Sequence, residues 1–133
     1  MEIIDAPFLK FSPDDLPRPW LPLTIINPHT GQTVNVYGLV DTGADECAVP
    51  AHYAPMIGHS LQAGTEKSIR TGNGITTAYA HTLSFETHGI KIENVLIDFM
   101  PNLNVVLLGV KSFLSNFVLT IDYKKSVFSL KQK

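Results

Sequence analysis

Apolar and polar positions alternate with a period of two along much of this chain, a pattern typical of β-strands with one buried face. Residues 20–27 and 33–40 are two such stretches, and the Asn-Pro-His-Thr-Gly turn at 27–31 joins them as a hairpin. A Gly-Asn-Gly turn at 72–74 precedes a longer strand over 75–87, whose apolar residues lie mostly on odd positions. These segments predict a β-rich fold.

The next strand, predicted over 90–99, changes parity along its length. Its apolar residues fall on even positions up to 92 and on odd positions from 95 onward. A bulge near Glu93-Asn94 brings both sets to one face, because it inserts one extra residue into the strand.

The C-terminal third adds a buried strand and the one helical pattern of the chain. Residues 105–109 form an unbroken apolar run, so both faces of that strand are expected to be buried. Apolar residues then recur at i, i+3, i+4 and i+7 over 110–117, which predicts a short helix. Strands at 117–123 and 126–130 follow. The prediction is a mostly β domain with one short C-terminal helix.

The N-terminal segment differs in composition from the rest. Four prolines between positions 13 and 22 predict extended, non-helical chain, because proline fixes φ and removes a backbone donor. Residues 1–12 are too few to form a core, and an arm or an edge strand is expected. We therefore divide the chain into a proline-rich N-terminal arm at 1–19 and a single domain at 20–133.

Composition narrows the function classes. The 133 residues fit one domain, and 44% hydrophobic with 17% charged residues is ordinary for a globular protein. The formal net charge of −2, with no basic stripe, argues against a nucleic-acid partner. Cys47 is the only cysteine, and its acidic neighbours favour a small buried hydrophobe over a nucleophile.

Targeting and metal signals are also missing from the sequence. No secretory leader and no apolar run long enough to span a bilayer are visible, so we expect a cytoplasmic protein with no membrane partner. The five histidines lack a metal-binding spacing. No metal and no cofactor are expected.

The candidate chemistry lies at the end of the strand over 33–40, where Asp41-Thr42-Gly43-Ala44-Asp45 follows. Asp before Gly is common in ordinary turns, and three residues alone favour that interpretation. Apolar sequence on both sides favours the other one, because a carboxylate held there is partly desolvated. The motif occurs once, so a paired carboxylate requires a second copy of the chain.

Three motifs follow one another along the chain: Asp41-Thr42-Gly43-Ala44, the turn Gly72-Asn73-Gly74 and the run Val106-Leu107-Leu108-Gly109. In this order they resemble the retropepsin-like aspartic proteases, which include retroviral proteases and small prokaryotic relatives. The resemblance covers roughly residues 20–130. It implies the retropepsin-like acid-protease fold: a closed β-barrel-like half with a flap hairpin. It also implies an aspartic endopeptidase that acts as a C2 homodimer on a peptide or protein substrate.

The resemblance assigns roles to individual residues. Asp41 would be the catalytic carboxylate, Thr42 would bond the two active-site loops together, and Gly43 would allow close backbone approach. Leu108-Gly109 would support the loop from behind. The implied substrate-binding residues are Ala44, Asp45, Gly72, Asn73, Gly74, Ile75, Ala78 and Val105. The apolar ones among them predict a preference for apolar residues around the cut.

One departure from the viral pattern concerns Asp45. In the viral enzymes an arginine follows the glycine of the apolar run and pairs with this aspartate, whereas Val110 stands here. Asp45 could pair with Lys111, with Arg70, or with neither. The alternative function is therefore a retropepsin-fold dimerisation or peptide-binding module that is catalytically silent, or autoinhibited by the proline-rich arm.

Overall fold

The three-dimensional structure is a computed structural model that describes residues 2–72 and 74–133. Its strands are β1 (Glu2–Pro7), β2 (Trp20–Ile26), β3 (Thr33–Val40), β4 (Cys47–Pro50), β5 (Thr65–Thr71), β6 (Gly74–Thr87), β7 (Ile90–Met100), β8 (Val106–Leu108), β9 (Phe117–Asp122) and β10 (Val127–Gln132). The helical elements of the described residues are single turns: α1 (Tyr53–Met56), η1 (Leu61–Ala63) and η2 (Leu114–Asn116).

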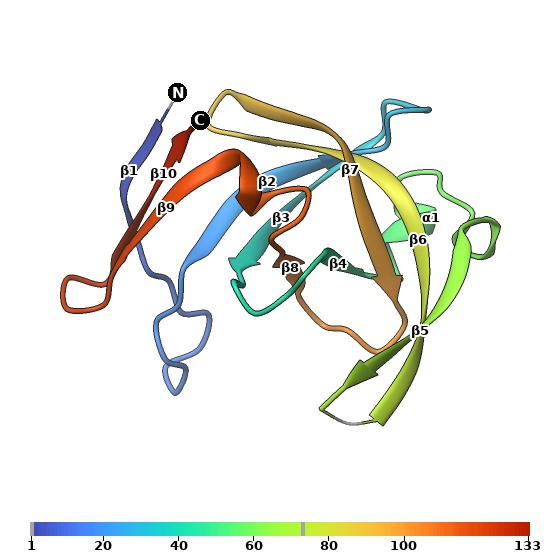
Figure 1. Cartoon of the computed structure of the whole chain (residues 1–133), viewed down its shortest axis with the longest axis horizontal. Helices are drawn as coiled ribbons and strands as arrows, with labels where there is room; N and C mark the ends of the chain where they lie inside the picture. Colours follow the sequence, from blue (N-terminus) through green and yellow to red (C-terminus); the bar gives the residue numbers. More distant parts are fainter. Residues whose placement is uncertain (1, 73) are drawn as a thin grey trace.

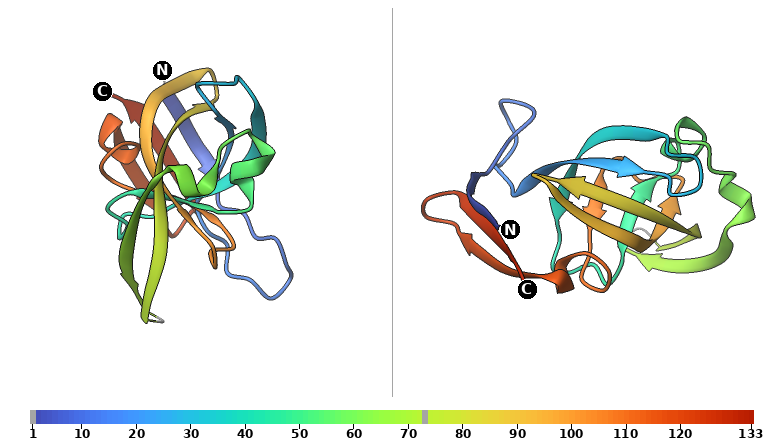
Figure 2. Two further views of the ribbon diagram at one scale, coloured as in Figure 1. Left: turned by 90° about the vertical axis from the view of Figure 1, so that its right-hand side faces the viewer. Right: turned by 90° about the horizontal axis from the view of Figure 1, so that it is seen from above.

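Six strands close into a barrel, as the predicted fold class requires (Figure 1). Their order is β2-β3-β8-β4-β7-β6, and β6 pairs with β2 to complete the ring. Strand β5 continues the sheet beyond β6 and pairs with it antiparallel, from Thr65 opposite Ala80 to Thr71 opposite Gly74. Because β5 is the last strand of this sheet, the β5–β6 hairpin extends away from the barrel (Figures 1 and 2).

The bulge predicted near Glu93-Asn94 is confirmed. The pairing of β6 with β7 shifts between Leu83 and Phe85, so that Glu93 and Asn94 together face Ser84. Asn94 adopts φ 56°, in the left-handed region that asparagine tolerates better than most residues. The shift lets the apolar residues on both sides of the bulge point into the core.

A separate three-stranded sheet, in the order β1-β10-β9, contains both chain ends. Glu2 lies opposite Lys131, so the two termini are side by side (Figures 1 and 2). Strand β1 is thus the edge strand expected for the first residues. The division into an arm at 1–19 and a domain at 20–133 stays a prediction.

Aromatic side chains fill much of the core. Phe85 and Phe113 are both fully buried, and their ring centroids lie 5.7 Å apart. Phe117 lies 5.4 Å from Phe113 by the same measure. The segment at 110–117 is therefore packed onto the barrel by Phe113, Leu114 and Phe117, whereas Val110 is exposed.

The helix expected over 110–117 is much shorter than the pattern suggested. Only the 3₁₀ turn η2 forms there, preceded by hydrogen-bonded turns. The N–H groups of Val110 and Lys111 donate instead to the carbonyl oxygens of Ala44 and Asp45, at 2.9 and 2.8 Å. Such bonds are compatible with a helix start, because the first N–H groups of a helix have no acceptor within it. The next N–H groups, of Leu114 and Ser115, donate to the carbonyl oxygens of Gly109 and Val110 five residues back, at 3.0 and 2.9 Å, so the four-residue spacing of an α-helix does not form.

In the described part of the chain, no helix has the length and apolar character needed to cross a membrane.

Candidate active site

The Asp-Thr-Gly loop, residues 41–46, connects β3 to β4 at the lower edge of the barrel in Figure 1. Asp41 is half-buried, whereas Thr42 and Gly43 are exposed. The Gly43 N–H donates to Asp41 Oδ1 at 3.0 Å, and the Ala44 N–H donates to the Asp41 carbonyl at 3.2 Å. This tight turn fixes the direction of the Asp41 carboxyl group relative to the backbone.

The loop is held from behind by the end of β8. Strands β3 and β8 run parallel with Val40 opposite Leu108, and the Asp41 N–H donates to the Leu108 carbonyl at 3.1 Å. A Cβ atom on Gly109 would lie 2.3 Å from the Glu46 carbonyl oxygen and 2.9 Å from that of Ala44. Only glycine allows this close approach of the two backbone segments, which explains why a glycine follows the apolar run.

Cys47, the first residue of β4, follows the loop and contacts Gly109. The thiol is fully buried, and the Gly109 N–H points at its Sγ atom at 3.3 Å. Burial raises the pKa of Cys47 to about 11, so the thiol stays protonated at neutral pH. Cys47 therefore packs as the small hydrophobe that its acidic neighbours suggested.

A pocket of about 510 Å³ opens directly beside the loop; we call it the Ala44 pocket. Gly43 and Ala44 form its end next to Asp41, and its apolar lining is Ala48, Ile69, Met100 and Leu107. Leu107 is half-buried, so the strand predicted to be buried on both faces turns one side chain toward this pocket. The charged residues of the lining are Asp45, Glu46, Lys67, Arg70, Asp98 and Lys111.

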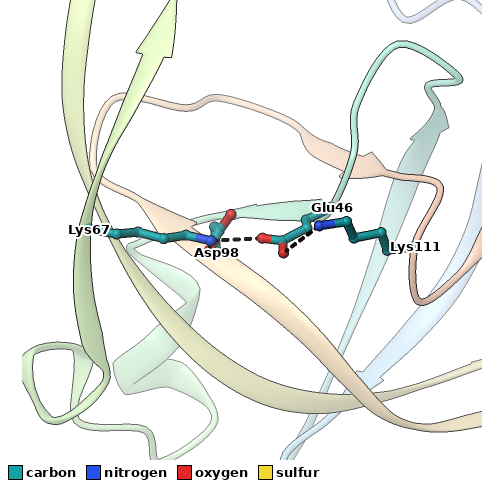
Figure 3. Close-up of polar contacts among 4 residues, drawn as sticks. All are labelled: Glu46, Lys67, Asp98 and Lys111. Atoms are coloured by element: carbon teal, nitrogen blue, oxygen red, sulfur yellow. Dashed lines mark hydrogen bonds and ion pairs between the residues drawn. The ribbon is translucent and has the colours of Figure 1, made fainter.

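Four of these charged residues form a connected network in one wall (Figure 3). The Lys67 ammonium lies 2.7 Å from Glu46 Oε2 and 2.8 Å from Asp98 Oδ1. Lys111 approaches Glu46 Oε1 more loosely, at 3.8 Å. The Asp98 side chain is only 6% exposed, so its charge depends on this lysine for compensation.

The network shifts the pKa values of its members in different directions. The hydrogen bond from Lys67 lowers the pKa of Glu46, against the effect of partial burial. Burial raises the pKa of Asp98, and the neighbouring Glu46 carboxylate adds to this rise. Burial alone would lower the pKa of Lys67, but the hydrogen bonds to Asp98 and Glu46 outweigh it and raise that pKa.

The residues expected on the β5–β6 hairpin lie in different environments. Gly72 and Gly74 are exposed at its tip, and Gly74 adopts φ 113°, which favours glycine. Asn73 lies outside the described residues. Ile75 is 71% exposed, whereas Ala78 is fully buried and faces the interior.

The four described hairpin residues expected to bind substrate, Gly72, Gly74, Ile75 and Ala78, lie outside the lining of the Ala44 pocket. Half-buried Val105 lies outside it as well. Ile69, from the other strand of the hairpin, lines the pocket instead. The sequence did not indicate β5 as a source of lining residues, because the regular alternation of apolar and polar positions lies in β6.

The missing arginine partner of Asp45 is not replaced within the described chain. Lys111 pairs with Glu46, and the Asp45 carboxylate has no ion pair with any described residue. The backbone carbonyl of Asp45 does accept the Lys111 N–H. Within the described residues of one chain, Asp45 therefore forms an ion pair with neither Lys111 nor Arg70.

The proline-rich arm lies against the other side of the loop. The Val40 N–H donates to the Pro19 carbonyl at 3.0 Å, which ties the arm to the strand that ends at Asp41. Residues 16–19, together with Asp41 and Thr42, line a second cavity of about 430 Å³, the arm cavity. The described residues contain no cluster of His, Cys, Asp or Glu side chains suited to a metal ion.

Sequence reasoning missed Glu46, Lys67 and Asp98. Glu46 directly follows the motif and could have been noticed. Asp98 gave a weaker signal, as a carboxylate inside an otherwise apolar strand. Lys67 gave none, because its partners lie 21 and 31 positions away and only the fold brings them together.

Comparison with known proteins agrees with the fold and the loop. The model of a family described as “gag-polyprotein putative aspartyl protease” matches residues 29–116. Among solved structures, a retropepsin-like aspartic protease from Rickettsia conorii is similar, with 26% sequence identity and a TM-score of 0.71. The match covers 98% of each chain. No curated protein matches.

The closed barrel and the structural match over nearly the whole chain define a protein of the retropepsin-like aspartic protease class. The family match spans more than half of the chain and includes the Asp-Thr-Gly loop. The chain belongs to this gag-polyprotein type of aspartyl protease family.

Proposed function

We propose that the protein is an aspartic endopeptidase whose active site forms between two copies of the chain, each contributing Asp41. The observation that carries the proposal is the Asp41 carboxyl group itself. It is half-buried at the end of a barrel strand, oriented by the Gly43 N–H, and adjacent to a pocket of about 510 Å³. The motif occurs once, so the second carboxyl group comes from a second chain.

The chemistry follows from placing two carboxyl groups close together. Like charges about 3 Å apart do not both ionise, so the pair shares one proton, as is established for aspartic proteases. The ionised Asp41 removes a proton from a bound water, which attacks the peptide carbonyl. The protonated Asp41 polarises that carbonyl and later helps to protonate the leaving amine. Activity is therefore expected on the acidic side of neutral, with a bell-shaped pH profile.

The substrate is proposed to lie as an extended strand between the loop and the β5–β6 hairpin, which acts as a flap. Backbone hydrogen bonds supply much of the binding in such strand-like complexes. Gly72, Asn73 and Gly74 form the tip that closes over the peptide. Apolar residues of the Ala44 pocket favour apolar side chains near the cut, and Asp45 borders the same pocket.

The sheet formed by β1, β10 and β9 is the proposed contact between the two copies. Strands β1 and β9 are its outer strands, and each carries an exposed apolar residue: Ile4 is 68% and Val118 is 52% exposed. Retropepsin-like proteases generally act as dimers on peptide substrates, which supports a C2 arrangement.

A second candidate is an autoinhibited form of the same enzyme. The position of residues 16–19 beside Asp41 and Thr42 favours it, since the arm cavity lies next to the proposed catalytic group. In this form the arm limits access until it is displaced or removed. A higher cleavage rate in the double variant Leu16→Gly, Arg18→Gly, which opens the arm cavity and keeps β1, supports this form, and an unchanged rate counts against it.

The direct test is cleavage of a diverse peptide pool, read by mass spectrometry between pH 3 and 8. Asp41→Asn protein serves as the control, because Asn keeps the Oδ1 acceptor that the Gly43 N–H requires. Cuts between apolar residues that disappear with Asp41→Asn support the proposal. Dimeric wild-type protein without Asp41-dependent cuts would refute it.

A further inference from the structure

The Lys67 ammonium connects the β5–β6 hairpin to the barrel in the wall of the Ala44 pocket, through its contacts with Glu46 and Asp98. We propose that Lys67 is a positioning residue, which holds the hairpin at a fixed height over the pocket through its ion pairs with Glu46 and Asp98 (Figure 3). The inference rests on the proposed function, because the hairpin is taken to close over a peptide.

The three residues come from three separate elements. Lys67 belongs to β5, Glu46 to the Asp-Thr-Gly loop, and Asp98 to the barrel strand β7. Strand β5 is an edge strand that pairs only with β6 in the described sheet. Its other side therefore has no strand to fix it, and the Lys67 side chain links that strand to the barrel (Figure 3).

The burial of the partners gives these ion pairs more weight than an exposed pair has. The side chains of Lys67, Glu46 and Asp98 are 35%, 19% and 6% exposed. Both ion pairs are short, at 2.7 and 2.8 Å, and the contact with Glu46 is also a charge-assisted hydrogen bond. Exposed pairs contribute little, whereas loss of one partner of a buried pair leaves an uncompensated charge.

The link has a direct consequence for substrate binding. Glu46 is five residues from Asp41 and lies in the same loop, so the position of β5 is set relative to the proposed catalytic group. A hairpin that is released from the barrel must be ordered again by each bound peptide. The free-energy cost of ordering the hairpin raises the Michaelis constant, whereas kcat changes little because the reacting atoms are unchanged.

The experiment compares Lys67→Met with Lys67→Arg, which keeps the positive charge. Lys91→Met is the matched control, because Lys91 forms an exposed ion pair with Glu93 at 3.5 Å, outside the pocket. Lys67→Met combined with Asp98→Asn provides a second variant, in which the 6% exposed carboxylate of Asp98 is also removed and Glu46 keeps its contact with Lys111 at 3.8 Å. Hydrogen exchange of the β5 amides and KM and kcat on the fastest-cleaved pool peptide are measured.

The expected result is exchange in β5 about five- to tenfold faster in Lys67→Met and in the double variant, with β2 and β3 unchanged. KM is expected to rise about three- to tenfold while kcat changes less than about twofold. Lys67→Arg and Lys91→Met should stay within about twofold of wild type in both readouts.

Two results would overturn the inference. One is wild-type exchange in β5 of both Lys67→Met proteins. The other is faster exchange throughout the barrel, which indicates general destabilisation. If the wild-type protein cleaves no peptide, the proposed function fails, and the exchange of β5 alone decides whether Lys67 holds the hairpin.

Discussion

Replacing Gly109 with alanine tests how closely the Asp-Thr-Gly loop depends on the end of β8. Its added Cβ atom would lie 2.3 Å from the Glu46 carbonyl oxygen, whereas ordinary contacts begin at 3.4 Å. The two atoms must therefore separate by 3.4 − 2.3 = 1.1 Å. Both sides of the contact are backbone, so no flexible side chain can absorb the displacement.

The displacement affects both the stability of the fold and the rate of catalysis. Overpacking of a tight site costs about 1–3 kcal/mol of unfolding free energy, which lowers Tm by roughly 3–12 °C for a domain of this length. A shift of about 1 Å at a reacting group reduces the rate of catalysis by about 100-fold. A 100-fold loss corresponds to about 2.7 kcal/mol, similar to the loss of stability. We therefore expect Gly109→Ala protein to stay folded at room temperature and to lose about 100-fold in cleavage rate.

The assay is peptide cleavage together with thermal unfolding at one fixed protein concentration, because a dimer unfolds at a concentration-dependent Tm. Gly72→Ala controls for the general effect of an added methyl group on stability, since no atom of the described residues beyond its chain neighbours lies within 4 Å of its Cβ position. Gly109→Ala protein with wild-type Tm and wild-type cleavage would refute the account of the loop.

Three further predictions concern single side chains. Asp41→Asn should abolish cleavage and leave Tm within about 2 °C of wild type, measured by differential scanning calorimetry. Cys47, with its pKa raised to about 11, should react with iodoacetamide at pH 8 only after unfolding; rapid labelling of folded protein contradicts its burial. Because the pKa of Glu46 is lowered in the folded protein, ionised Glu46 stabilises the fold at pH values above its unfolded pKa of 4.5. This stabilisation is lost as the pH falls through the folded pKa. Glu46→Gln should therefore reduce the loss of Tm between pH 6 and pH 3, and an unchanged slope contradicts that role.

Local pattern was sufficient to predict the hairpin that delivers Asp41. Period-two alternation placed β3 at its observed bounds, Thr33–Val40, and turn residues placed Asp41 directly after it. The bulge at Glu93-Asn94 was predictable for the same reason, because a change of parity has few other structural solutions.

Contacts between distant segments could not be predicted in this way. The apolar spacing over 110–117 was real, but the Leu114 and Ser115 amides bond five residues back instead of four, and only a 3₁₀ turn forms. Lys67 and Asp98 are 31 positions apart, and neither has a local pattern that indicates the other. The residues of this pocket wall are therefore identified only in the three-dimensional structure, where the closed barrel brings them together.

The central claim is that one active site requires Asp41 from two chains. Its most direct test is to mix wild-type and Asp41→Asn protein in varying proportions at one fixed total protein concentration, allow the subunits to exchange, and measure cleavage. If both carboxyl groups are required, activity follows the square of the wild-type fraction and is about one quarter at equal amounts. Activity of about one half at that point, falling linearly with the wild-type fraction, would contradict a shared site.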